Sequence, residues 1–249
     1  RKNRKLGQCF LSDSRILDRE ARIISPEGRR VLEIGAGDGR LSERLLSAKE
    51  LALVEKDPRF ASLLRDKFSK NMNVRVIQGD FLGLEPFDVD LIVGNVPYNI
   101  SSAITFRLID WKFRRAVLMF QKEFARKLCA RGSEMSRISF FAQHYFSIVE
   151  HFIVPKSAFR PRPKVDSALV ELAPTHAPPI PPAVHQAITT LFQHRQKQLS
   201  SSIRVYCRET GKNPERVLAH IQSAGIPLNK RIFQLSHSEI MKIGKEISG

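Results

Sequence analysis

Asn95, Val96, Pro97 and Tyr98 are the residues of this sequence whose types and spacing indicate the most specific chemistry. The Asn95 side-chain carbonyl and a backbone carbonyl near Pro97 can accept hydrogen bonds from an amine without a formal base. Tyr98 offers a flat face on which an extruded nucleobase can stack. These groups suit alkylation of the exocyclic amine of adenine, which is a weak nucleophile because its lone pair is delocalised into the ring. The competing interpretation is a turn at the end of a strand with a packed tyrosine.

A glycine-rich segment, VLEIGAGDGRLSERL, predicts a strand, a tight turn and a helix in direct succession. Gly35, Gly37 and Gly39 allow the backbone to approach a ligand closely. Their G-x-G-x-G spacing differs from the G-x-G-x-x-G of dinucleotide-binding dehydrogenases. Glu33 and Asp38 would be poor neighbours for a pyrophosphate, but they suit a cationic sulfonium ligand with an amino-acid tail. The loop therefore favours S-adenosylmethionine over NAD as the cofactor.

Acidic residues stand at the ends of the next two candidate strands. Glu55 can accept both hydrogen bonds of a ribose diol, and we count its neighbour Lys56 among the expected cofactor contacts. Asp80 can accept a hydrogen bond from the adenine amine of the cofactor, while Phe81 packs near the adenine ring. A lone acidic residue is usually a surface carboxylate. Here, however, the carboxyl ends of consecutive strands meet at one edge, where ligands of open α/β sheets bind, so these positions indicate a cofactor site.

Short apolar runs alternate with amphipathic helical patterns from residue 31 onward. The runs that predict strands lie at 31–35, 51–55, 74–78, 90–95 and 116–121. Apolar residues at helical spacing lie between them, for example Leu41, Leu45 and Leu46. This alternation is typical of a mostly parallel sheet that is covered on both faces. Two later runs, 147–154 and 167–172, would complete the sheet, and the second can pair antiparallel at or near its edge.

The segment 173–182 contains five prolines and predicts a linker, because proline interrupts both helices and central strands. Beyond it apolar residues recur at helical spacing, and Ser236 with Glu239 forms a capping-box signature. We therefore expect a basic N-terminal segment with a Rossmann-like α/β domain over residues 1–174. A small helical domain should follow over residues 182–249.

The chain is strongly basic, with 41 Lys and Arg against 25 Asp and Glu and a net charge of +16. Both the part before the linker and the part after it carry this excess, which favours a partner with many phosphates. The three cysteines match neither a disulfide framework nor a zinc-ligand pattern, so we expect no metal. No apolar run is long enough to cross a membrane, and the charged start lacks the apolar core of a secretory signal. We expect a cytoplasmic protein that binds no membrane.

Besides the glycine loop, ordered blocks of sequence cover nearly the whole chain. They are KLGQCFLSD (5–13), NVPYNIS (95–101), FQKEFARKL (120–128), FRPRPKVDSALVEL (159–172) and LFQHRQKQL (191–199). In these blocks the chain resembles the ribosomal RNA small-subunit adenine N6,N6-dimethyltransferases. That family contains the bacterial kasugamycin-resistance methyltransferase and its archaeal and eukaryotic counterparts.

The resemblance implies a class I S-adenosylmethionine-dependent methyltransferase fold with a small all-helical C-terminal domain, and we expect a monomer. It also implies the substrate, a pair of adjacent adenosines in a hairpin near the 3′ end of small-subunit ribosomal RNA. Each adenosine would be converted to the dimethyl form within a pre-ribosomal small subunit.

For individual residues, the resemblance implies that Cys9 and Leu11 touch the cofactor, alongside Gly35, Glu55, Asp80 and Asn95. It also implies that Phe159 flanks the target adenine opposite Tyr98. The family usually has Asn or His at the position of Cys9, so the contact expected there is backbone-mediated or altered. Basic side chains in two of the blocks are expected to guide the RNA: Arg160, Arg162, Lys164, Arg195 and Lys197.

Two alternatives stay open. A methyltransferase of the macrolide-resistance type, acting on large-subunit ribosomal RNA, shares the opening block and the Asn-x-Pro-Tyr motif, although blocks 159–172 and 191–199 favour the small-subunit family. A non-catalytic RNA-binding or ribosome-assembly factor could use the same fold. The intact cofactor loop and the intact segment Asn95–Tyr98 favour catalysis.

Overall fold

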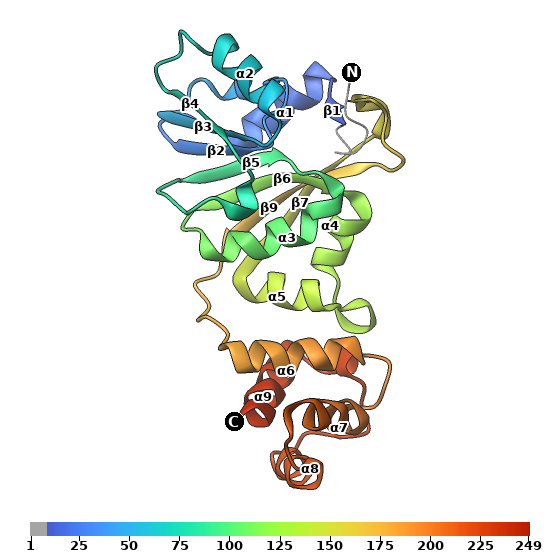
Figure 1. The fold of residues 1–249 in the computed structure, drawn as a ribbon. Coiled ribbons are helices and arrows are strands. Elements are labelled where there is room, and N and C mark those ends of the chain that lie inside the picture. Colours follow the sequence, from blue (N-terminus) through green and yellow to red (C-terminus); the bar gives the residue numbers. More distant parts are fainter. Residues whose placement is uncertain (1–8) are drawn as a thin grey trace. The chain divides into compact units, whose positions relative to one another are not determined.

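The computed structural model describes residues 9–249 and contains a seven-stranded sheet (Figure 1). Its strands lie side by side in the order β4 (Val74–Gln78), β3 (Glu50–Glu55), β2 (Arg30–Ile34), β5 (Leu91–Asn95), β6 (Arg115–Gln121), β9 (Ser167–Pro174) and β7 (Phe146–Val154). The first five are parallel to one another, and β9 pairs antiparallel with both β6 and β7. The prediction of a mostly parallel sheet, with the 167–172 run antiparallel next to the edge, is confirmed.

Helices cover both faces of this sheet. Figure 1 shows α1 (Ser14–Ile24) and α2 (Pro58–Lys67) on one side, and α3 (Ser101–Arg107) and α4 (Lys122–Cys129) on the other. The central strands are buried over almost their whole length, since they have helices on each side. Strands that are buried on both faces need apolar residues at nearly every position, which explains the near-continuous apolar runs in the sequence.

The helix expected after the glycine loop, from the spacing of Leu41, Leu45 and Leu46, is wrong. The chain forms only a 3-10 turn over Ser42–Leu45. It then pairs through Ala48 with Glu27 and enters β3, so too few residues remain for a longer helix. The Ser42 hydroxyl meanwhile turns inward and donates a hydrogen bond to Glu33.

Two elements near the N-terminus are missing from the sequence analysis. Helix α1 is capped by Asp13, whose side chain accepts hydrogen bonds from two backbone N–H groups of the first turn. Strand β1 (Phe10–Leu11) pairs antiparallel with β8 (Phe159–Arg160). This pairing brings the opening block of the sequence beside the block that begins at Phe159.

The C-terminal part of the chain is helical, as expected, with α6 (Pro182–Gln193), α7 (Leu199–Thr210), α8 (Pro214–Ser223) and α9 (His237–Ser248). The capping box is present, because Ser236 accepts a hydrogen bond from the Glu239 N–H while the Glu239 side chain accepts one from the Ser236 N–H.

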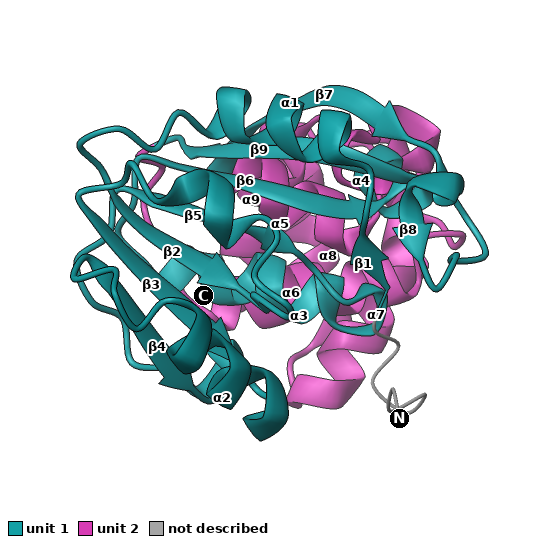
Figure 2. Ribbon diagram, turned by 90° about the horizontal axis from the view of Figure 1, so that it is seen from above, with its two compact units in different colours: residues 1–126, 145–175 teal, residues 127–144, 176–249 magenta. Residues whose placement is uncertain are grey.

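The chain divides into two compact units (Figure 2). The first contains residues up to 126 together with 145–175, and the second contains 127–144 and 176–249. The second unit thus includes most of α5 (Arg137–Tyr145), which lies inside the expected α/β domain of residues 1–174. The reason is packing within this unit, where the Phe140 ring lies 5.6 Å from that of Phe192. The expected domain bounds, 1–174 and 182–249, stay a prediction.

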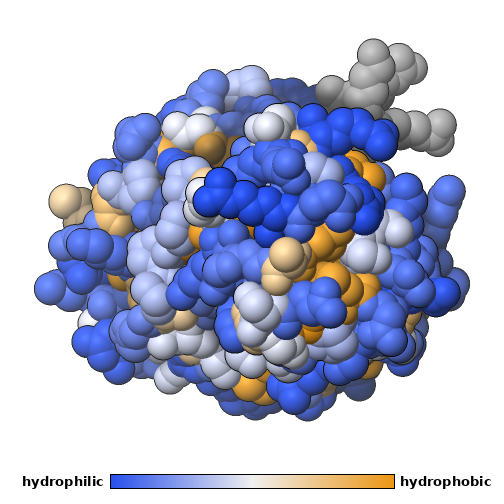
Figure 3. Space-filling view, turned by 90° about the horizontal axis from the view of Figure 1, so that it is seen from below, coloured by the Kyte–Doolittle hydropathy of each residue, from blue (hydrophilic) through white to orange (hydrophobic). Residues whose placement is uncertain are grey.

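The surface is mainly polar where Figure 3 shows it, with apolar side chains in smaller areas between. Within residues 9–249, none of the helices combines the length and the apolar character needed to cross a bilayer. Both observations concern the described part of the chain alone.

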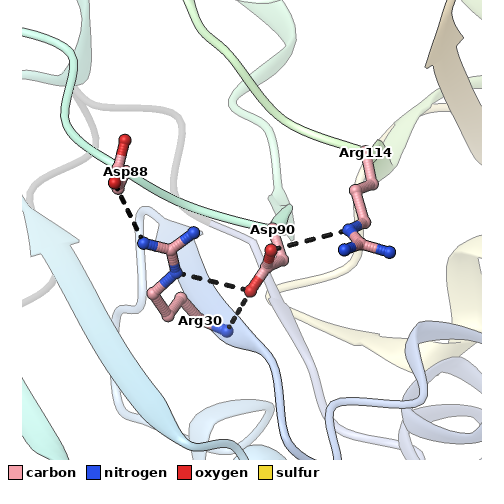
Figure 4. A network of polar contacts seen from close by, with 4 residues as sticks. All are labelled: Arg30, Asp88, Asp90 and Arg114. Atoms are coloured by element: carbon pink, nitrogen blue, oxygen red, sulfur yellow. Dashed lines mark hydrogen bonds and ion pairs between the residues drawn. The ribbon is translucent and has the colours of Figure 1, made fainter.

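A polar network around Asp90 holds the amino ends of β2 and β5 together (Figure 4). Asp90 accepts a hydrogen bond from the backbone N–H of Arg30 at 2.9 Å and pairs with the guanidinium groups of Arg30 and Arg114 at 3.5 and 3.6 Å. Arg30 also pairs with Asp88 at 3.1 Å. The Asp90 side chain is only 18% exposed, whereas that of Asp88 is 85% exposed. The Arg30 N–H, followed by its guanidinium, holds the pKa of Asp90 below its usual range.

Asp90→Ala is expected to lower the free energy of unfolding by about 1–3 kcal/mol, because the Arg30 N–H loses a charged acceptor in a site largely removed from water. Asp88→Ala is the matched control and should change stability little, because that carboxylate faces solvent. Urea unfolding near pH 7 measures both. A lowered folded-state pKa stabilises the fold above the unfolded-state pKa of about 4, and this contribution disappears as the pH falls through the folded-state value. The difference between wild type and Asp90→Ala should therefore shrink in acid, and equal effects of the two substitutions would contradict the assignment.

Candidate active site

A pocket of the first unit lies at the carboxyl ends of strands β2, β3, β4 and β5. It brings together all the residues expected at the cofactor and the target base: Cys9, Leu11, Gly35, Gly37, Glu55, Lys56, Asp80, Phe81, Asn95, Pro97, Tyr98 and Phe159. These residues come from six separate stretches of the sequence. Their proximity supports one shared site, while the role of each residue stays a prediction.

Glu55 holds the glycine loop in place. One carboxylate oxygen accepts a hydrogen bond from the Gly37 N–H at 2.9 Å, and the other accepts one from the Asp57 N–H at 2.8 Å. Gly37 has a φ of 56°, and a Cβ atom there would lie 2.7 Å from the Phe10 ring, so the turn at this position requires glycine. The loop therefore leaves a cradle of bare backbone facing the pocket, which fits a ligand that approaches closely.

The two acidic residues of the loop segment, which are expected to suit a cationic ligand, have different environments. Glu33 lines the pocket but is only 3% exposed, and burial raises its pKa to about 8, so it is largely neutral at pH 7. Asp38 is paired with Arg40 at 2.9 Å. A cationic ligand would thus meet a buried carboxyl group that can still lose its proton.

Asp80 lies at the mouth of the pocket and is paired with Lys56, whose Nζ is 2.7 Å from one of its oxygens. The other oxygen accepts a hydrogen bond from the Leu82 N–H at 3.1 Å. The Lys56 ammonium group holds the pKa of Asp80 below its usual range, so this carboxylate stays charged. Phe81 is buried and its ring stacks on Trp111 at 5.3 Å, which fixes the pocket wall beside Asp80.

Asn95 ends β5, and its side-chain oxygen is buried without a hydrogen-bond partner among the described residues. A buried carbonyl oxygen normally has a donor, because an unsatisfied one costs about 1–3 kcal/mol. The Pro97 carbonyl accepts a hydrogen bond from the Ile100 N–H at 3.1 Å, which leaves its second lone pair for another donor. The Asn95 side-chain oxygen and the Pro97 carbonyl oxygen can therefore both accept hydrogen bonds from an amine placed in this pocket.

Tyr98 is half-buried, and its hydroxyl lies 2.8 Å from the Ser167 hydroxyl at the start of β9. Burial raises the pKa of Tyr98, so the phenol stays neutral. Phe159 lies in the pocket wall and is 2% exposed. Ser167 stands in the block 159–172, but nothing in the sequence indicates a role for it. Only the three-dimensional contact shows that it fixes the tyrosine ring.

The family model described as ribosomal RNA adenine dimethylase matches residues 1–248. The chain belongs to this family. A probable ribosomal RNA small subunit methyltransferase A of Thermococcus onnurineus is 37% identical, over 98% of this chain and 91% of its own length. The corresponding protein of Methanothermobacter thermautotrophicus is 39% identical, over 99% of this chain and 91% of its own length.

Two solved structures are similar over nearly the whole chain. A dimethyladenosine transferase from Plasmodium falciparum has a TM-score of 0.82 at 26% identity and covers 94% of this chain and 95% of its own. The 23S rRNA methyltransferase ErmE has a TM-score of 0.65 at 27% identity, with coverage of 96% and 100%. The class I methyltransferase fold, the enzymatic class and S-adenosylmethionine as methyl donor follow for this member of the ribosomal RNA adenine dimethylases.

The basic side chains expected to guide RNA lie in both units of this dimethylase. Arg160, Arg162 and Lys164 are exposed in the first unit, and the Arg160 guanidinium donates to the carbonyls of Ser157 and Phe159. In the second unit Lys197 is exposed, whereas Arg195 is half-buried.

Like that of Arg160, the guanidinium of Arg195 is engaged by a backbone carbonyl of its own unit. It donates a hydrogen bond to the Met135 carbonyl at 3.0 Å. Part of its role is therefore to hold residues 127–144 in this unit. Its other N–H groups leave an RNA contact possible, and that contact stays a prediction.

Glu55→Gln is expected to weaken cofactor binding by about tenfold, which corresponds to about 1.4 kcal/mol. The amide can accept one of the two backbone hydrogen bonds, but its NH2 group then faces the other N–H, so the glycine loop loses its support. Glu50→Gln, an exposed position at the start of the same strand, is the matched control. Calorimetric titration with S-adenosylmethionine measures both variants, and a wild-type dissociation constant for Glu55→Gln would refute the role given to this carboxylate.

Proposed function

We propose that this enzyme dimethylates the exocyclic amines of two adjacent adenosines in a hairpin near the 3′ end of small-subunit ribosomal RNA. The observation that carries the proposal is the buried, unpartnered Asn95 oxygen inside the pocket that holds the glycine loop. An amine is a donor that this oxygen lacks. The small-subunit methyltransferase names of the relatives in Thermococcus and Methanothermobacter support the choice of RNA.

In the proposed mechanism, Asn95 and the Pro97 carbonyl accept hydrogen bonds from the adenine amine and turn its lone pair toward the methyl group. As the new N–C bond forms and the S–C bond breaks, the amine nitrogen becomes positively charged and then loses one proton to solvent. When bound, the cofactor supplies an electrophilic methyl group on a positively charged sulfur. Tyr98 presents a ring face to the extruded base, and its hydrogen bond to Ser167 keeps the ring from rotating away. Phe159 forms the opposite wall. Positioning of the reacting atoms then supplies most of the rate enhancement.

The setting we propose is a pre-ribosomal small subunit in the cytoplasm, with the enzyme acting as a monomer. The support is the net charge of +16 and the exposed Arg160, Arg162, Lys164 and Lys197, since ribosomal RNA is rich in phosphates. Arg195 would add a contact from its free N–H groups. These residues would position the RNA, whereas the pocket would select adenine.

A second candidate target is an adenine in large-subunit ribosomal RNA. The specific observation in its favour is the similarity to the 23S rRNA methyltransferase ErmE, which covers 96% of this chain. The higher TM-score of the dimethyladenosine transferase, 0.82 against 0.65, supports the small-subunit assignment.

Asn95→Ala is expected to reduce turnover by more than about tenfold while cofactor binding is retained, because the substitution removes an acceptor for the target amine and leaves the glycine loop intact. Single-turnover methylation of undermethylated small subunits measures the first quantity, and calorimetry with S-adenosylmethionine measures the second. Turnover near the wild-type value would contradict the role of Asn95 as an acceptor for the target amine.

The RNA target itself is tested by mapping. Undermethylated small and large subunits are incubated separately with the enzyme and radiolabelled S-adenosylmethionine, and the label is located by primer extension. We expect label on two adjacent adenosines of the small-subunit RNA, present as dimethyladenosine. Label in the large subunit would support the second candidate, and no label in either would favour a non-catalytic binding factor.

A further inference from the structure

A buried carboxyl group occupies a position of helix α1 where an apolar residue would be expected. Glu20 is in α1, on the buried side of the helix between Leu17 and Ile24. Its relative exposure is 0%, and neither carboxyl oxygen has a hydrogen-bond partner among residues 9–249. A buried carboxyl group without partners is costly, and far more so when it is ionised. This residue is therefore the least satisfied titratable group of the described chain.

Glu20 is next to a second buried carboxyl group, Glu33 of β2, which accepts a hydrogen bond from Ser42 at 2.6 Å. Burial, and then the neighbouring Glu33, raises the pKa of Glu20 to about 8. Burial likewise raises the pKa of Glu33 to about 8, and the Ser42 hydroxyl opposes this increase. Both carboxyl groups are therefore largely protonated at neutral pH, chiefly because burial disfavours the ionised form, and for Glu20 also because Glu33 is near.

The charged groups around this pair do not neutralise it. Glu55 and Asp38, from the end of β3 and the glycine loop, raise the pKa of Glu33 further. Lys67 of α2 lowers it, but its ammonium group is engaged with Glu43 at 2.9 Å and with the Asp38 carbonyl at 2.8 Å. On α1 and the following turn, Asp18 and Arg44 pair with each other at 2.6 Å. Among the described residues around the pair, no cationic side chain is thus available to balance the negative charge that the two carboxyl groups would carry when ionised.

The pocket supplies a place for such a cation. Glu33 lines it, and so does Leu17, which lies one helical turn before Glu20. S-adenosylmethionine carries a positive sulfonium group and an amino-acid ammonium group, whereas the product S-adenosylhomocysteine has a neutral sulfur. A positive charge next to a buried carboxyl group favours its ionised form, and the effect is large where water is excluded.

We propose that Glu20 and Glu33 form a charge-sensing pair that releases a proton to solvent when S-adenosylmethionine binds, and that retains it when S-adenosylhomocysteine binds. The pair is thereby a specificity device that favours the charged cofactor over its neutral product. Glu33 is the member that faces the ligand, and Glu20 acts through Glu33 as a positioning residue. This inference concerns cofactor binding and does not depend on which RNA is methylated.

The sign of the pH dependence follows from linkage. Below the pKa of the empty pair, binding must expel a proton, so affinity for S-adenosylmethionine rises with pH by up to about tenfold per unit for each proton released. Above pH 8 the pair is already ionised and the dependence levels off. The ligand amine also titrates, but it is common to both ligands, so the difference between S-adenosylmethionine and S-adenosylhomocysteine isolates the sulfonium charge.

The test is calorimetric titration of the full chain with each ligand at pH 7, in phosphate and in Tris, whose ionisation heats differ. The wild type should release about one proton more with S-adenosylmethionine than with S-adenosylhomocysteine. Glu20→Gln keeps the shape of the side chain. In this variant the difference in proton release between the two ligands should fall below half of the wild-type difference. The ratio of its dissociation constants for the two ligands should change less than about threefold between pH 6 and 8. Glu50→Gln, exposed at the start of β3, should behave as the wild type. Equal proton release with both ligands, or an unchanged difference in Glu20→Gln, would overturn the proposal.

A measurement without ligand keeps the proposal testable if Glu20→Gln binds poorly. A carboxyl group whose folded-state pKa is raised stabilises the fold at low pH, and this contribution is lost as the pH rises through the folded-state value. The Tm of the wild type should therefore fall by more than that of Glu20→Gln as the pH rises from about 5 to about 8, because in this range the unfolded carboxyl group is ionised while the folded one keeps its proton. Parallel pH profiles of the two proteins would show that the pair does not hold the proton and would refute the mechanism.

Discussion

The hydrogen bonds of Glu55 are the interaction on which the pocket depends. The three glycines of the loop have no side chains with which to pack, so contacts from other residues must help to fix the shape of the loop. Glu55 does so from the end of β3 through the Gly37 N–H, and also binds the Asp57 N–H that begins the next connection. The parallel sheet makes this possible, because it places the end of β3 beside the end of β2. The hydrogen bonds from backbone N–H groups to Glu55 thus hold the ends of β2 and β3 together as one side of the pocket.

Much of the fold can be predicted from the sequence, because the sheet is buried on both faces and its strands are plain apolar runs. The run 74–78 coincides with β4, and the others differ by a residue or so at their ends. The helix expected from Leu41, Leu45 and Leu46 fails because helical spacing over six residues cannot distinguish one turn from a helix. Helix α1 could not be predicted as easily, partly because the charged residue Glu20 interrupts the apolar pattern of its buried face.

Contacts between distant parts of the sequence are the part that could not be predicted. The pairing of Phe10 with Arg160 joins segments 150 residues apart, and nothing in either segment specifies the other. The same holds for Tyr98 and Ser167, whose hydroxyl contact requires β9 to lie beside β6. Residue types at strand ends indicate a site, whereas the side chains that hold those residues in place are found only from the structure.

The protonation states of the pocket carboxyl groups show why residue type alone was insufficient. Asp80 and Glu33 are both acidic residues at one ligand site, yet Lys56 lowers the pKa of the first while burial raises that of the second. Such opposite shifts within one site give similar groups different tasks. The charged Asp80 suits a lasting hydrogen-bond acceptor, because it needs no ligand to stabilise its charge. The Ser42 hydroxyl and Lys67 stabilise the Glu33 anion too little to offset its burial, so a cation within the pocket would shift this group toward its charged form.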